Sequence, residues 1–175
     1  MLFRSCHDPD IDEESYLRVI RYKTAKLFEA AGRLGAVIGG GSEAQKHALG
    51  LYGMHLGTAF QLIDDVLDYS GDFLKTGKNI GDDLAEGKPT LPLLYAMKHG
   101  TPEQATSIRH AIQHGGLTEF QSVLAAIKDT QALQYTRMQA QREIKIASEA
   151  ISGLPDSKFK SALLQLAVFA IDRSY

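Results

Sequence analysis

The chain has 175 residues, of which 44% are hydrophobic and 23% charged, and its formal net charge is −2. This length and composition suffice for one domain with a hydrophobic core and exclude a disordered chain. The near-neutral charge gives no support for binding nucleic acid or an anionic membrane surface.

The compartment is predicted from the single cysteine and from the lack of long apolar runs. Cys6 has no partner for an intramolecular disulfide, which favours a reducing compartment. No apolar run approaches the roughly 20 residues that span a bilayer, and the N-terminus does not resemble a secretory signal. We therefore expect a cytoplasmic protein without a transmembrane segment.

The first helix is predicted to begin near Glu13, after a frayed leader over residues 1–10, and to end at the glycines 39–41. Apolar residues recur along it at helical spacing. Lys23 and Thr24 lie beside this apolar stripe, where a partly sheltered ammonium next to a hydroxyl could bind phosphate. A solvated surface is the ordinary alternative for such a pair.

The second helix is predicted to begin after Ser42, which forms a capping box with Gln45, and to run to about Tyr69. Glycines repeat along it at positions 50, 53 and 57. Because each glycine costs a helix up to about 1 kcal/mol relative to alanine, their repetition predicts close packing against another helix. We interpret His55 on the same helix as a packed or surface residue.

The last part of this second helix, residues 57–68, carries an acidic face. At roughly 100° per residue, one side of the helix collects four polar residues, Gln61, Asp64, Asp65 and Asp68. The opposite side is apolar and is expected to form core, through Leu56, Phe60, Ile63, Val66 and Leu67. Neighbouring carboxylates on one face repel by roughly 3 kcal/mol per pair at an effective dielectric near 20. Water offsets this repulsion on an exposed face, and Mg²⁺ is the alternative, since it prefers hard oxygen ligands.

The longest irregular stretch spans residues 70–89 and contains four glycines and three lysines. Loops of this length within a domain tend to be functional or disordered. Gly77 and Lys78 suggest a phosphate-binding P-loop, but the glycine spacing, Asn79 and the preceding helix do not fit that motif. We expect a loop that brings Lys78 and Lys88 back over the acidic helix end, with further acids at positions 82 and 83.

The remainder of the chain is predicted to be a succession of helices. One begins at Leu91, and capping boxes at residues 101–104 and 118–121 begin two more. A longer helix spans about residues 130–152, and Asp156 or Ser157 caps the last one. That last helix is expected to bury Phe159, Leu163, Leu166, Val168 or Ala167, and Ala170. No segment alternates long enough to form a strand, so the fold class is all-α.

His110 and His114 lie one helical turn apart, a spacing that can bind zinc. The sequence offers no third ligand, so we do not predict a zinc site.

Three motifs together resemble one family. They are the helix Gly-Thr-Ala-Phe-Gln-Leu-Ile-Asp-Asp-Val-Leu-Asp at 57–68, the loop Gly-Lys-Asn-Ile-Gly-Asp-Asp-Leu-Ala-Glu-Gly-Lys-Pro-Thr-Leu-Pro-Leu at 77–93, and Lys-Thr-Ala-Lys-Leu-Phe at 23–28. In this order and spacing they resemble the trans-polyprenyl diphosphate synthases, and within them the long-chain octaprenyl type. The resemblance covers nearly the whole chain from about Asp8. It implies a helical bundle that is the C-terminal part of an isoprenoid-synthase fold, with residues 1–175 as a single, partial synthase domain and 70–89 as its active-site loop.

The resemblance also implies the site residues and their ligands. Asp64, Asp65 and Asp68 look like the second of the family's two aspartate-rich motifs, which would hold Mg²⁺ against the allylic diphosphate. The residues expected to contact that diphosphate or its metal shell are Lys23, Thr24, Gln61, Lys78 and Lys88, and the first four of these form the expected catalytic set. Cations beside a departing pyrophosphate stabilise its developing charge, which is the main contribution a site can make to allylic ionisation.

The first aspartate-rich motif, the upstream basic residues for isopentenyl diphosphate and the helix that sets product length have no counterpart in this sequence. We therefore expect a prenyltransferase half that is weakly active or inactive alone and that forms a homo-oligomer or pairs with an N-terminal half. The alternative is a non-catalytic helical subunit or interaction module of a prenyl synthase complex. A terpene cyclase shares the ionisation chemistry but does not match the loop.

Overall fold

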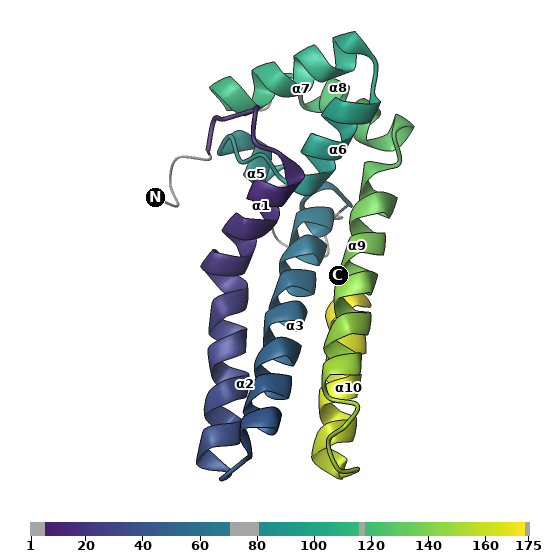
Figure 1. Ribbon diagram of the computed structural model, residues 1–175. Helices are drawn as coiled ribbons and strands as arrows, with labels where there is room; N and C mark the ends of the chain where they lie inside the picture. Colours follow the sequence, from purple (N-terminus) through teal and green to yellow (C-terminus); the bar gives the residue numbers. More distant parts are fainter. Residues whose placement is uncertain (1–5, 71–80, 116–117, 174–175) are drawn as a thin grey trace. The chain divides into compact units, whose positions relative to one another are not determined.

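The structure is a computed structural model that describes residues 6–70, 81–115 and 118–173 (Figure 1). Helices account for all of its regular secondary structure, and no strand occurs among the described residues, so the all-α prediction is confirmed. The helices are α1 Glu13–Ile20, the π-helix η2 Arg21–Ala25, α2 Lys26–Ile38, α3 Glu43–Ser70, α5 Asp82–Ala85, α6 Leu91–His99, α7 Pro102–His114, α8 Phe120–Asp129, α9 Ala132–Ala150 and α10 Lys158–Ile171.

Most of the predicted helix boundaries follow from local capping chemistry. The boxes at Ser42 and Thr101 are present, and in each the backbone and side-chain hydrogen bonds are reciprocal. Ser157 is the N-cap residue of α10, as predicted, and its hydroxyl accepts a bond from the Lys160 N–H. The box predicted at Thr118 is wrong, because the N-cap residue of α8 is Glu119 and Thr118 lies in the preceding turn.

The chain divides into two compact units. The first contains the residues up to Arg18 together with Asp64–Arg137, and the second contains Val19–Ile63 and Met138–Arg173. Helices α1, α3 and α9 each contribute residues to both units. That residues 1–175 form one domain stays a prediction.

The first unit has its core among α6, α7 and α8 and the last turn of α3, with α6 to α8 drawn in teal and green in Figure 1. The largest side chains in this core that are shielded from water are Leu84, Leu93, Ile108, Ile112 and Val123. Burial of a side chain of this kind contributes about 1.5 to 3 kcal/mol. This core holds the short helix α5 through Leu84, and α5 carries the acids Asp82 and Asp83.

The segment before α1 is anchored on the first unit. The His7 N–H donates to the carbonyl oxygen of Gly87 at 2.7 Å, and the His7 ring lies 3.1 Å from the carbonyl oxygen of Ile112. Asp10 pairs with Arg109 at 2.8 Å. The predicted fraying of the leader is therefore wrong for residues 7–10, while residues 1–5 lie outside the described part of the chain.

The second unit depends on close backbone contact between α3 and the η2 and α2 segment. A Cβ atom added at Gly53 would lie 2.2 Å from the carbonyl oxygen of Phe28, and one at Gly57 would lie 2.7 Å from the Cα of Ala25. A Cβ at Gly32 on α2 would meet the carbonyl oxygen of Leu49 at 2.2 Å. The prediction that the glycines of this helix mark close packing is confirmed.

Helix α10 packs through its smallest residues. Ala167 and Ala170 are buried, and Leu163 is half-buried, whereas Phe159, Leu166 and Val168 are exposed. The prediction of burial is wrong for Phe159 and Leu166, and of the alternatives Val168 or Ala167 it is Ala167 that is buried. A search of the described residues finds no helix long and apolar enough to cross a membrane, and the cytoplasmic location stays a prediction.

The close approach at Gly53 predicts a specific stability effect. Gly53→Ala should lower the free energy of unfolding by about 1 to 3 kcal/mol, because the new methyl group meets a backbone carbonyl that cannot move aside. Gly35→Ala is the matched control in α2, where an added Cβ has no neighbour within 4 Å, and it should be neutral or stabilising by up to about 1 kcal/mol. Urea unfolding followed by circular dichroism measures both, and equal effects would contradict close packing.

Candidate functional site

The three predicted metal-binding acids lie in the last turns of α3, in the first unit. Asp64 and Asp68 are half-buried, but Asp65 is only 4% exposed and belongs to the interior. The sequence placed the three carboxylates on one acidic side of the helix, and in the structure only Asp65 of the three is shielded from water. The apolar side was predicted correctly for Leu56, Ile63 and Val66, which are buried.

Asp65 is held inside by two donors. The Tyr16 hydroxyl of α1 donates to its Oδ2, and the backbone N–H of Leu91, at the start of α6, donates to the same carboxyl group. Burial raises the pKa of Asp65 to about 8, which these two hydrogen bonds oppose only in part. Burial and the neighbouring Asp65 also raise the pKa of Tyr16. The carboxyl group thus ties α3 to α1 and α6.

Asp68 is linked to α5. Its backbone carbonyl accepts the Gly81 N–H at 2.9 Å, and its Oδ2 accepts the Asp83 N–H at 3.3 Å. Gly81 is the N-cap residue of α5 and has φ of 87°, a left-handed conformation that suits glycine. Burial raises the pKa of Asp68 to about 7, and the negative charges of Asp83 and Asp82 add to the rise.

Lys88 reaches the same acidic group. Its ammonium lies 2.8 Å from Asp83 Oδ1 and 2.7 Å from Glu86 Oε2. Partial burial alone would lower the pKa of Lys88, but the hydrogen bonds to these carboxylates raise it above its usual range. The predicted return of Lys88 and the acids at 82 and 83 to the end of α3 is confirmed by these contacts. Lys78, predicted to accompany Lys88, lies outside the described residues.

The remaining predicted residues belong to the second unit. The Thr24 hydroxyl donates to Gln61 Oε1 at 2.8 Å, so two residues predicted separately form one hydrogen-bonded pair. Lys23 and Thr24 both lie in η2, a π-helical turn that the sequence did not predict. Lys23 is exposed, which agrees with the solvated-surface alternative and not with a partly sheltered ammonium.

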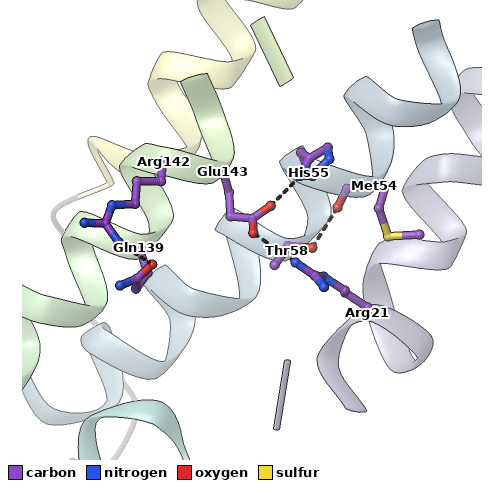
Figure 2. Close-up of polar contacts among 7 residues, drawn as sticks. All are labelled: Arg21, Met54, His55, Thr58, Gln139, Arg142 and Glu143. Carbon is purple, nitrogen blue, oxygen red and sulfur yellow. Dashed lines mark hydrogen bonds and ion pairs between the residues drawn. The ribbon is translucent and has the colours of Figure 1, made fainter. Parts of the chain in front are cut away.

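The second unit contains a further cluster of polar side chains that the sequence did not predict. Figure 2 shows Glu143 of α9 between Arg21 of η2 and His55 of α3. His55, interpreted from the sequence as a packed or surface residue, is thus a hydrogen-bonding partner of Glu143. Glu143 lies 122 residues from Arg21 and 88 from His55, and no local motif joins them.

The acidic side chains of the first unit determine whether a divalent metal ion could bind there. Across residues 6–70, 81–115 and 118–173, no three His, Cys, Asp or Glu side chains converge as a ready-made cage. Asp68, Asp82 and Asp83 nevertheless lie within each other's electrostatic field, since the latter two raise the pKa of the first. This arrangement suits Mg²⁺, which is usually held by one or two carboxylates plus water and substrate phosphates. His110 and His114 stack at 4.0 Å, and His110 pairs with Glu119 rather than forming a metal site.

The raised pKa of Asp68 predicts a pH-dependent stability. The ordinary value is 3.8, so between about pH 4 and 7 the unfolded chain releases a proton that the folded chain keeps. The contribution of Asp68 to stability is therefore full below about pH 4 and is lost as the pH rises through about 7. In buffer with EDTA, the unfolding free energy of the unsubstituted chain minus that of Asp68→Asn should fall between about pH 5 and pH 8.

Gln165→Ala is the control for this measurement, because it removes an exposed side chain of α10 that carries no titratable group. Its difference from the unsubstituted chain should stay flat over the same range. An Asp68→Asn difference that is equally flat would contradict the burial of a proton-binding carboxyl group at the end of α3.

Comparison with known proteins finds relatives that match nearly the whole chain. Octaprenyl diphosphate synthase of Haemophilus influenzae is 53% identical over 170 residues, which are 97% of this chain and 52% of that protein. The chain spans about half the length of the curated relatives it matches. A polyprenyl synthase of Caulobacter crescentus CB15, crystallised with calcium and isoprenyl diphosphate, superposes with a TM-score of 0.90 at 41% identity, over 98% of this chain and 53% of that one.

A geranylgeranyl pyrophosphate synthase of Corynebacterium glutamicum, crystallised with isoprenyl diphosphate and magnesium, superposes with a TM-score of 0.82 at 31% identity, over 92% of this chain and 47% of that one. The family model described as polyprenyl synthetase matches residues 1–130. The resemblance found in the three sequence motifs is thereby confirmed, and the chain belongs to the polyprenyl synthetase family.

Proposed function

We propose that the acids at the end of α3 and the residues predicted to contact the diphosphate form the substrate site of a prenyltransferase. Such an enzyme condenses an allylic diphosphate with isopentenyl diphosphate. The observation that carries the proposal is the crowding of acids at the end of α3. Asp68 is half-buried among the negative charges of Asp82 and Asp83, and its pKa is raised in consequence. Such a group is unfavourable unless protons or cations neutralise it. Lys88 supplies one positive charge, and a divalent ion would supply the rest.

Asp64 and Asp68 are the proposed Mg²⁺ ligands on α3. Asp65, by contrast, accepts hydrogen bonds from Tyr16 and Leu91 and is shielded from water. We assign it the role of keeping its neighbours in place. The bound ion would supply charge neutralisation for the diphosphate. Relatives crystallised with isoprenyl diphosphate and calcium or magnesium support a divalent cation here.

The basic and polar residues of the proposed site act on the diphosphate oxygens. Lys23, Lys78 and Lys88 contribute positive charge, which stabilises the pyrophosphate as the allylic C–O bond breaks. Thr24 and Gln61 hold each other through their hydrogen bond, so both side chains are already ordered before a ligand arrives. Only the second aspartate-rich motif of the family is present in this sequence, so we expect the isolated chain to bind the diphosphate but not to complete prenyl transfer.

The proposal predicts metal-dependent binding of inorganic pyrophosphate. Calorimetry should detect binding with Mg²⁺ and none with EDTA, because the acids alone repel the anion. Asp64→Ala should abolish the binding by removing a metal ligand. The control is Asp172→Ala, an exposed acid of α10's C-terminal end, which should bind as the unsubstituted chain does. Metal-independent binding, or normal binding by Asp64→Ala, would contradict the proposed site.

A second candidate function, a helical interaction module, is favoured by the exposed apolar side chains of the second unit. On α2, Leu34 is 58% exposed and Ile38 is 86% exposed, and on α10 Phe159 is 71% exposed and Phe169 is 62% exposed. Large apolar surface of this kind marks interaction sites. In this function the chain would pair with another copy or with a partner subunit.

The interaction module predicts self-association that depends on these side chains. Light scattering should then give a mass above 19.2 kDa, and the double substitution Leu34→Glu and Ile38→Glu should reduce it toward that of a monomer. Lys158→Glu changes a charge on α10 without removing apolar surface and serves as the control. A chain that is monomeric at all concentrations would speak against pairing with itself and leave the diphosphate site as the better proposal.

A further inference from the structure

The π-helical turn η2 connects α1 and α2 without a break in the helical run. The residues that flank it, Ile20 and Lys26, both have right-handed helical dihedral angles. A π-turn closes its hydrogen bonds one residue later than an α-helix, is rare, and is found frequently at functional sites. Here it contains both Lys23 and Thr24, the residues proposed to contact the diphosphate.

Three contacts fasten this turn at its two ends. At its C-terminal end, Thr24 bonds to Gln61, and Ala25 lies against the backbone at Gly57, where an added Cβ would be 2.7 Å from the Ala25 Cα. At its N-terminal end, the Arg21 guanidinium lies 3.1 Å from Glu143 Oε1 of α9. Lys23 lies between the two fastened ends, so its position depends on both.

Of the residues in the contact at the N-terminal end of η2, Glu143 is the least exposed to water. Its side chain is 12% exposed, and its second oxygen lies 2.5 Å from Nδ1 of His55, whose side chain is 19% exposed. A ring nitrogen that faces a carboxylate donates, so Glu143 accepts from η2 and from α3 at once. Charge-assisted hydrogen bonds of this kind are about twice as strong as neutral ones. In Figure 2 the neighbours of Glu143 on α9, Gln139 and Arg142, form a hydrogen bond with each other instead.

We propose that Glu143 is a positioning residue for the diphosphate site. It holds Arg21 against α9 and His55 on α3, and so keeps the widened turn in the form that presents Lys23 and Thr24 to the ligand. It contacts neither of those two residues and acts through Arg21. This inference rests on the proposed function, because that function assigns the diphosphate to the turn.

The test is Glu143→Gln, which keeps the length of the side chain and removes its charge. The oxygen of a glutamine can accept a hydrogen bond from either Arg21 or His55. Its NH₂ group then faces the N–H of the other residue, and two donors form no hydrogen bond. The dissociation constant for inorganic pyrophosphate with Mg²⁺ should rise roughly tenfold. Glu149→Gln is the matched control, since Glu149 lies on the same helix with a side chain 64% exposed and 3.9 Å from Lys145. It should leave the constant unchanged.

Arg21→Gln is the second variant, which keeps the experiment decisive if Glu143→Gln does not fold. It removes a side chain that is 40% exposed and leaves the contact between His55 and Glu143 intact. It should weaken pyrophosphate binding to a similar degree. Hydrogen exchange in the peptide that covers residues 19–27 should be faster in both variants and unchanged in Glu149→Gln.

A double-mutant cycle separates positioning from general destabilisation. Thr24→Ala alone should weaken pyrophosphate binding, and adding Glu143→Gln should weaken it little further, because the two contacts serve one turn. Full additivity, or normal binding by both Glu143→Gln and Arg21→Gln, overturns the inference and leaves the proposed function standing. Absence of Mg²⁺-dependent binding by the unsubstituted chain overturns the proposed function and this inference with it.

Discussion

The acidic end of α3 depends on the burial of one carboxyl group. Asp65 lies where an apolar residue would ordinarily pack, and it is tolerated there because Tyr16 and the Leu91 N–H both donate to it. A buried polar group without such partners would cost about 1 to 3 kcal/mol or more. These two bonds bring three separate segments, α1, α3 and α6, to a common point. Asp64 and Asp68, the half-buried acids on either side of Asp65, lie within one helical turn of that point.

The two units differ in how far their carboxylates are paired with positively charged or hydrogen-bonding side chains. In the first, Asp83 donates its backbone N–H to Asp68, and among the described residues Lys88 is the cation that pairs with Asp83, which leaves these acids partly compensated within that part of the chain. In the second, Glu143 is matched by Arg21 and His55, so its charge is used internally. An incompletely neutralised cluster is suited to binding, whereas a fully paired one is suited to holding its surroundings in place.

The features that the sequence predicted are those encoded by neighbouring residues. The capping boxes at Ser42 and Thr101, the glycine contacts of α3 and the acids at its end all follow from spacings of a few residues. The resemblance added the residues expected to contact a diphosphate, of which Thr24 and Gln61 form a hydrogen bond in the structure.

What the sequence could not predict depends on distant partners. Asp65 lies on the same side of the helix as Asp64 and Asp68, and its burial depends on two donors that are distant in sequence, Tyr16 and the Leu91 N–H. The pairing of Arg21 with Glu143 spans 122 residues. On α10 the apolar pattern indicated a buried face, but periodicity alone cannot tell whether a large residue such as Phe159 finds a partner.

The π-turn between α1 and α2 has a consequence for how this helical run can change in evolution. A turn that closes one residue late accommodates one extra residue, and each residue of an α-helix adds roughly 100° of rotation. Removing one residue within η2 would let an ordinary turn form while Gly32 still faces α3. Removing one residue between η2 and Gly32 would rotate Gly32 away from its contact with Leu49. The turn is therefore a place in this run where one residue can be lost while Gly32 keeps its packing, at the expense of the contacts that present Lys23 and Thr24.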